Sequence, residues 1–220
     1  MRSSFDRRVV PDEALALVRA CQNRVPAHLA GGAALSGAYL AHRLSGDLDL
    51  FCHQAEDVRL LVRELPDIGA ESGVAIELVR DAGTFVRARV RLPGRDLEID
   101  LVHEAVADIE PPPAPIDGVV VESLADLRAA KLTCILSRSE PRDLVDLLYL
   151  DRAGFPPEED MTLALRKDGG IDPGVLAWLL GQFPVRPLPM MLEPLTVEEL
   201  TAFRDALRER FRRHAVPQDG

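Results

Sequence analysis

The spacing of apolar positions near the start of the chain predicts a helix followed by a short strand. Leu15 and Val18 lie at helical spacing behind Pro11, and acidic residues in the first turn suit a helix N-terminus. A short apolar run then ends in Gly31 and Gly32, which is typical of a strand that enters a tight turn.

Between this glycine pair and Pro66 the pattern alternates between helix and strand. Helical spacing is compatible with a helix over residues 33–44, and strict alternation of apolar and polar residues predicts a strand over 45–52. Helical spacing returns at Glu56, and we expect this helix to end at Leu65 because proline disrupts a helix interior.

Three further strand-like runs are separated by glycine-containing hairpin turns and cover residues 73–79, 84–92 and 95–102. This order predicts an α+β fold, with a mixed sheet flanked by helices. Residues 111–118, PPPAPIDG, predict a stiff connector, since consecutive prolines continue neither a helix nor a sheet. We therefore expect one domain over residues 1–110 and a helical domain over 119–220.

Within the C-terminal domain, the pattern predicts a helix from Ser123 to about Arg138 and a second helix that begins at Pro141. A looser stretch rich in proline and glycine follows. Thr196 and Glu199 then form a capping box, which predicts the start of a last, arginine-rich helix.

Composition narrows the classes of function. The 220 residues carry a net charge of −10 and only 5% aromatic residues, which argues against broad, non-specific binding of nucleic acid. Three cysteines without a CxxC pair indicate neither a disulfide framework nor a structural zinc site. The sequence shows no secretory signal and no apolar run of membrane-spanning length, so we expect a cytoplasmic protein with no membrane partner.

The strand over residues 45–52 carries two aspartates on one face. Because side chains alternate along a strand, Asp47 and Asp49 point to the same side and Leu48 points to the core. Aspartate is depleted in strands, and a divalent cation relieves the repulsion between two such carboxylates. The alternative is a solvated edge strand whose charges face water.

A third acid repeats this arrangement. Asp100 and Glu98 lie opposite the apolar face of the strand over residues 95–102. Together, Asp47, Asp49 and Asp100 would hold two metal ions that activate a nucleophile and neutralise a leaving pyrophosphate. Glu98 is the competing ligand, and a solvated strand face is again the alternative.

Gly31 and Gly32 lie at the predicted junction of strand and helix. Glycines there let backbone amides approach a phosphate, and a helix N-terminus favours an anion. A glycine pair by itself more often marks only a turn, so the interpretation depends on the nearby Asp47 and Asp49.

Other polar groupings have plainer interpretations. A soft-metal site made of Cys52, His53 and His103 would have a spacing that fits no zinc motif. Arginines at alternate positions of residues 84–92, and those of the last helix, would either follow an RNA backbone or form ordinary ion pairs.

The run LAGGAALSGAYLAHRLSGDLDLF resembles the signature of the AbiEii/AbiGii toxin family of nucleotidyltransferases. The matching positions are Gly31, Gly32, Ala34, Leu35, His42, Arg43, Ser45, Asp47, Leu48, Asp49 and Phe51. A second motif also resembles the family pattern, and its positions are Asp126, Lys131, Arg138, Asp143 and Asp146.

The resemblance implies a polymerase-β-like nucleotidyltransferase that moves a nucleoside monophosphate from an NTP to an acceptor hydroxyl. It implies that Lys131 contacts a nucleotide phosphate and that Asp143 completes the active site. With Mg²⁺, or Mn²⁺ in its place, on the three carboxylates, the expected nucleotide-binding residues are Gly31, Gly32, Arg43, Ser45, Lys131 and Arg138. For the helical residues the alternative is an ion-pair network between two packed helices.

The family resemblance further implies a toxin of a toxin–antitoxin or phage-defence system, acting on RNA such as tRNA, with a cognate antitoxin protein. Family members usually carry Ser or Thr after the glycine pair, whereas this chain has Ala33. That departure favours the alternative of a catalytically silent homologue that binds or regulates. An enzyme that nucleotidylates a cationic antibiotic is the other alternative, because the chain is acidic.

Overall fold

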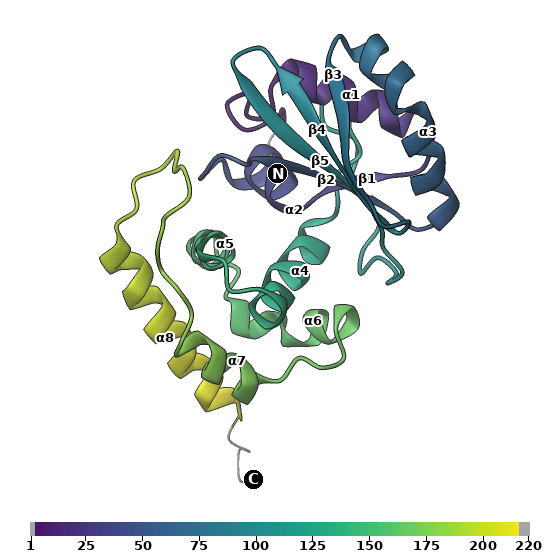
Figure 1. The fold of residues 1–220 in the computed structure, drawn as a ribbon. Helices are drawn as coiled ribbons and strands as arrows, with labels where there is room; N and C mark the ends of the chain where they lie inside the picture. The colour runs from purple at the N-terminus through teal and green to yellow at the C-terminus, as the bar shows by residue number, and fades with distance from the viewer. Residues whose placement is uncertain (1–2, 216–220) are drawn as a thin grey trace. The chain divides into compact units, whose positions relative to one another are not determined.

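A computed structural model describes residues 3–215, and the chain divides into two compact units, Met1–Ser123 and Leu124–Gly220 (Figure 1). The division falls after Ser123, and residues 111–118, expected as a connector, lie within the first unit. Asp117 holds this segment there, because its carboxylate accepts hydrogen bonds from the Phe5 backbone N–H at 2.9 Å and from Arg7 Nη1 at 2.8 Å.

The first unit is built on a five-stranded sheet in the order β1-β2-β5-β4-β3. Its strands are β1 (His28–Ala30), β2 (Asp47–Cys52), β3 (Ala75–Asp81), β4 (Phe85–Leu92) and β5 (Arg95–His103). β2 and β5 run parallel, and the other neighbouring pairs run antiparallel. The predicted mixed sheet is confirmed.

One face of this sheet is apolar and the other is charged, as the alternation in β2 and β5 predicts. Leu48, Ile99 and Leu101 are buried, α3 (Ala55–Ser72) packs on the sheet, and α1 (Asp12–Gln22) packs against α3 (Figure 1). Burial of each such side chain stabilises the fold by about 1.5–3 kcal/mol. The acids of β2 and β5 therefore remain on the opposite face.

The helix expected to end at Leu65 continues through Pro66 to Ser72, so that prediction is wrong. Ile68 is buried on the same helix as Leu61 and Leu65, at helical spacing across the proline. Burial of this continuous stripe outweighs the cost of about 3 kcal/mol that proline imposes inside a helix. The helix ends instead at a glycine in the left-handed conformation.

The helix expected over residues 33–44 is also shorter than predicted. It consists of α2 (Gly31–Ala34) and a π-helical turn, η1 (Leu35–Leu40), and Ala41 is left-handed with φ 54°. Arg43 therefore does not end a helix but lies in an extended segment before β2. A left-handed residue stops an α-helix because the next backbone N–H points away from the helix axis.

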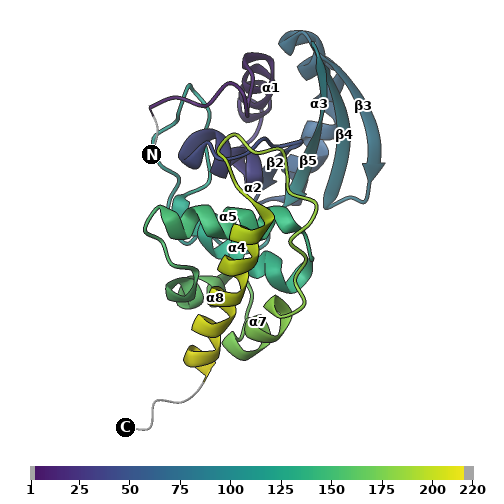
Figure 2. The ribbon, with the colours of Figure 1, turned by 90° about the vertical axis from the view of Figure 1, so that its left-hand side faces the viewer.

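The second unit is helical, and its central helix is α4 (Leu124–Ser137) (Figure 2). α4 packs against α5 (Pro141–Arg152), α6 (Met161–Lys167) and α7 (Pro173–Leu180), whereas α8 (Val197–Ala215) packs against α5 and α7. The short turn η2 (Pro157–Asp160), α6 and α7 lie within the looser stretch rich in proline and glycine. Over residues 3–215, none of the helices is both long and apolar enough to cross a membrane.

Candidate active site

Gly31 places the backbone directly against the carboxylate of Asp49. The antiparallel pairing of β1 and β2 sets Ala30 opposite Asp49, and Gly31 follows with φ +61°. A Cβ atom on Gly31 would lie 1.9 Å from Asp49 Oδ2. Glycine is therefore required here, both for the left-handed backbone and for the close approach of Asp49.

Gly32 makes a second close approach, to Arg43 and Ser45. A Cβ atom on Gly32 would lie 2.7 Å from Arg43 Nη2 and 3.0 Å from Ser45 Oγ. Ser45 Oγ in turn donates a hydrogen bond to Asp47 Oδ1 at 3.0 Å. The glycine turn, Arg43, Ser45 and the aspartates of β2 are thus gathered in one place.

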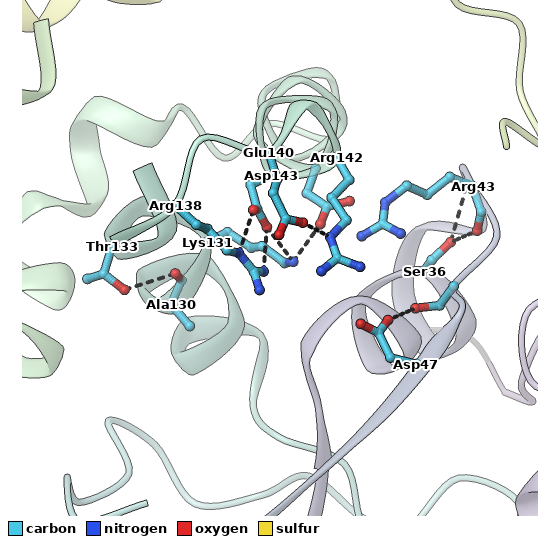
Figure 3. Close-up of polar contacts among 12 residues, drawn as sticks. Ser36, Arg43, Asp47, Ala130, Lys131, Thr133, Arg138, Glu140, Arg142 and Asp143 are labelled. Carbon is cyan, nitrogen blue, oxygen red and sulfur yellow. Dashed lines mark hydrogen bonds and ion pairs between the residues drawn. The ribbon is translucent and has the colours of Figure 1, made fainter. Parts of the chain in front are cut away.

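Ser36 anchors the segment that carries Arg43, as Figure 3 shows. Its hydroxyl donates to the Arg43 carbonyl oxygen at 2.6 Å and accepts from the Arg43 backbone N–H at 3.2 Å. Arg43 is only 2% exposed, and its Nη1 donates to the Leu44 carbonyl oxygen at 2.9 Å. The sequence reasoning missed Ser36, although a serine at a core-facing helical position was the available signal.

Asp100 lies beside Asp49 on the neighbouring strand. The parallel register of β2 and β5 pairs Asp49 with Asp100 and Asp47 with Glu98, and paired strands are about 4.8 Å apart. The Asp100 side chain is 5% exposed, whereas that of Glu98 is 38% exposed. The register therefore brings together the three carboxylates expected from the sequence, with Glu98 at the more open edge.

Arg87 on β4 is the countercharge of these acids. Its Nε donates to Asp100 Oδ1 at 2.8 Å and its Nη2 to Asp100 Oδ2 at 2.7 Å, while Nη1 lies 3.1 Å from Glu98 Oε2. The hydrogen bonds to Asp100 are the largest cause of the raised pKa of Arg87, and the charges of Glu98 and Asp47 add to it. The register of β4 with β5, which the sequence reasoning did not use, places Arg87 opposite Asp100.

The three carboxylates suit hard divalent cations. An ionised carboxylate has about four lone-pair sites, so the two bonds from Arg87 leave Asp100 with sites for a metal ion. Mg²⁺ prefers carboxylate oxygens together with substrate phosphates. Asp47, Asp49 and Asp100 therefore fit the two-metal arrangement as a set of donors.

The other arginines at alternate positions of β4 form ordinary ion pairs. Arg91 Nη2 lies 3.3 Å and Arg89 Nη1 3.8 Å from Glu77 Oε2 on β3. These ion pairs are the alternative interpretation of the stripe, and an RNA contact of this strand stays a prediction.

In the second unit, two cations converge on a pair of buried aspartates (Figure 3). Lys131 Nζ lies 3.1 Å from Asp143 Oδ1 and 2.7 Å from Asp146 Oδ2. Arg138 follows the last residue of α4 and donates from Nε and Nη2 to Asp143, at 2.8 and 2.9 Å. The four formal charges of this ion-pair network cancel.

The ion-pair network lowers the pKa of Asp143. Burial raises the pKa of Asp143, but the charges of Lys131 and Arg138 and the hydrogen bond from Arg138 outweigh burial and hold this pKa below its ordinary value. A neighbouring buried acid of the second motif, Asp126, pairs with Lys167 Nζ at 2.7 Å, a partner that sequence spacing did not indicate. These contacts match the alternative interpretation, an ion-pair network between two packed helices. A nucleotide role for Lys131 and Asp143 stays a prediction.

Comparisons with known proteins bear on the family and the fold of this chain. The model of a family described as the nucleotidyl transferase AbiEii toxin of a type IV toxin–antitoxin system matches residues 16–219. No curated protein matches the chain by sequence.

Three solved structures have the same fold. A candidate nucleotidyltransferase from H. pylori is 21% identical with a TM-score of 0.62, over 92% of this chain and 93% of that chain. JHP933 from Helicobacter pylori is 20% identical with a TM-score of 0.60, over 94% and 91% of the two chains. MenT4, a nucleotidyltransferase toxin from Mycobacterium tuberculosis H37Rv, is 19% identical with a TM-score of 0.56, over 94% and 88%.

Proposed function

Because the chain belongs to the AbiEii nucleotidyltransferase toxin family, we propose that it transfers a nucleoside monophosphate from an NTP to an acceptor hydroxyl with divalent metal ions. The observation that carries the proposal is the registered pair Asp49 and Asp100, with Gly31 seated against the Asp49 carboxylate. A structural turn would not need a carboxylate so close to its backbone. A site that must fix a metal ligand beside a phosphate needs this closeness.

Residues of the first unit have separate roles in the proposed reaction. Asp47, Asp49 and Asp100 would hold two Mg²⁺ ions, or Mn²⁺ in their place. Bound there, the ions would lower the pKa of the acceptor hydroxyl and neutralise charge on the leaving pyrophosphate. Ser45 orients Asp47 through its 3.0 Å hydrogen bond, and the lack of a side chain at Gly31 leaves room for the Asp49 carboxylate.

The bonds exchanged follow from the substrates. The acceptor oxygen forms a bond to the α-phosphorus, the bond from that phosphorus to the bridging oxygen breaks, and pyrophosphate leaves. The proton of the acceptor hydroxyl passes to one of the three carboxylates, which are the nearest bases in the proposed site. Lys131 and Arg138 are the proposed phosphate contacts of the second unit, with Asp143 holding both in place.

The proposed acceptor is RNA, with the tRNA 3′ end as the first candidate. The family's toxin description and the likeness to MenT4, a nucleotidyltransferase toxin, support the proposal of a toxin. We also propose a cognate antitoxin protein, a role in a toxin–antitoxin or phage-defence system, and a reaction in the cytoplasm, where NTP and tRNA are found.

The test uses the full chain with each of the four NTPs labelled at the α-phosphate, Mg²⁺, and either tRNA or an aminoglycoside. We expect labelled tRNA with an α-labelled NTP, no label from the same NTP labelled at the γ-phosphate, and no label after chelation by EDTA. Label on the aminoglycoside instead would favour an antibiotic-modifying enzyme. No label on either acceptor, with no calorimetric NTP binding, would identify a silent homologue and overturn the proposal.

A further inference from the structure

Three metal-ligating side chains meet near the C-terminal end of β2, the strand that carries two of the active-site carboxylates. His28 begins β1, His53 follows the last residue of β2, and Asp108 lies in the segment after β5. One ligand atom from each residue lies within 4.8 Å of the other two. His53 thus meets His28 and Asp108, and not Cys52 and His103, whose spacing fits no zinc motif.

Hydrogen bonding fixes the proton of His53. Its Nδ1 lies 3.0 Å from the Glu104 carbonyl oxygen, and a carbonyl oxygen only accepts, so Nδ1 carries the hydrogen. In the neutral ring, the lone pair then lies on Nε2, which faces Asp108 Oδ1 at 3.1 Å. Two electron-rich atoms at this distance need either a proton or a metal ion between them.

A second proton on His53 would account for its contact with Asp108 but not for the approach of His28 to the same carboxylate. His28 Nδ1 also lies 4.0 Å from Asp108 Oδ1, and the two imidazole rings meet edge to face with centroids 5.5 Å apart. Three ligands from three separate segments therefore approach one point. A metal ion accounts for this convergence more fully than one ion pair does.

After small side-chain rotations, the distances between these ligand atoms would suit tetrahedral coordination of a metal ion. With metal–ligand bonds of about 2.0–2.2 Å, ligand atoms in a tetrahedral site lie roughly 3.3–3.5 Å apart. The 3.1 Å and 4.0 Å separations bracket that value. The Glu104 carbonyl is also the kind of backbone acceptor that orients metal-binding histidines.

We propose that His28, His53 and Asp108 bind a divalent transition-metal ion of the Zn²⁺ class. Two imidazoles and one carboxylate favour Zn²⁺ over Mg²⁺, which prefers oxygen ligands. A pocket lined by His53, Gln54, Ala105, Ala107 and Asp108 gives solvent access, so water fills the fourth position.

This site is separate from the proposed catalytic carboxylates. Asp49 and His53 are four residue steps apart along the chain, which corresponds to about 13 Å in extended backbone. The ion would instead join the start of β1, the end of β2 and the segment after β5. Its predicted effect is on the stability of the first unit, and it does not depend on the proposed transfer reaction.

The test titrates Zn²⁺ into the EDTA-treated and desalted full chain, against a chromogenic chelator, with excess Mg²⁺ to occupy the other carboxylates. We expect one equivalent of tightly bound Zn²⁺ and a higher Tm. His28→Gln and Asp108→Asn should each lower the affinity at least tenfold. Co²⁺ in place of Zn²⁺ should give visible absorption bands that both variants lose.

Two variants serve as controls, and circular dichroism checks that each is folded. His103→Gln removes a nearby histidine outside the cluster, and Asp49→Asn removes a carboxylate of the other site; both should retain one equivalent of Zn²⁺. Absence of stoichiometric binding in the wild type would overturn the proposal and leave a His53–Asp108 ion pair. Unchanged binding in a folded His28→Gln variant would also overturn it.

Discussion

Substitution of Gly31 by alanine tests whether the close approach of this residue to Asp49 matters for catalysis. The new Cβ atom would lie 1.9 Å from Asp49 Oδ2, about 1.1 Å inside the 3.0 Å limit that such contacts respect. The backbone at φ +61° adds about 1–2 kcal/mol for a residue other than glycine. Asp49 must therefore move by about 1 Å, and a displacement of that size costs roughly 100-fold in rate.

Alanine substitutions at two other glycines separate the effect of backbone strain from the effect of the steric clash with Asp49. Gly73→Ala has the same left-handed strain, with φ +70°, but no atom within 4 Å of the new Cβ atom. Gly46→Ala has open space and no left-handed strain, although Gly46 directly precedes the aspartates of β2. We expect Gly73→Ala to lower stability alone, Gly46→Ala to change little, and Gly31→Ala to lower both.

The assay combines thermal unfolding with the rate of transfer from an α-labelled NTP, measured below the lowest Tm of the three variants. The reasoning would be refuted if Gly31→Ala kept a transfer rate within a few-fold of that of Gly73→Ala. Equal Tm values for Gly31→Ala and Gly46→Ala would contradict the strain argument separately.

Three further predictions concern the buried charges. Arg87→Met leaves Asp100 without its bidentate partner and should lower the free energy of unfolding in EDTA by about 2–3 kcal/mol. Mg²⁺ should restore part of this loss. A Tm of the variant that does not change with Mg²⁺ would count against Asp100 as a metal ligand. Lys131→Met removes the cation that the buried Asp143 and Asp146 share and should cost about 3–5 kcal/mol in urea unfolding, whereas a loss below 1 kcal/mol would contradict the network. Because the fold holds the pKa of Asp143 below its ordinary 3.8, its stabilisation is full above about pH 4 and is lost as the pH falls through the lower folded value. Urea unfolding of wild type and Asp143→Asn at pH 7 and pH 3 should show a stability difference that shrinks at pH 3, and a constant difference would refute the assignment.

Periodicity along the chain was sufficient to predict the strands. Alternation placed Asp47 and Asp49 on one face of β2, because a strand has a strict period of two. The capping box was also confirmed, since Glu199 Oε2 accepts from the Thr196 N–H at 2.8 Å and Thr196 Oγ1 accepts from the Glu199 N–H at 3.1 Å. Such features depend on residues close in sequence.

Features that depend on partners distant in sequence were missed. The continuation of α3 past Pro66 is set by burial against the rest of the first unit, which local propensity does not contain. Arg87 faces Asp100 only because of the register of β4 and β5. His28, His53 and Asp108 come from three segments, so no motif spacing predicts their meeting.

The carboxylate site is tested most directly by the single-turnover rate of transfer from an α-labelled NTP with two aspartate variants. Asp49→Asn removes one charge from the proposed metal site, whereas Asp96→Asn removes an exposed charge from the same strand as Asp100. We predict that Asp49→Asn, folded with a Tm near that of wild type, lowers the rate at least 1000-fold, on the order of 4 kcal/mol, and that Asp96→Asn leaves it unchanged. A folded Asp49→Asn variant with a rate within tenfold of wild type would contradict the account.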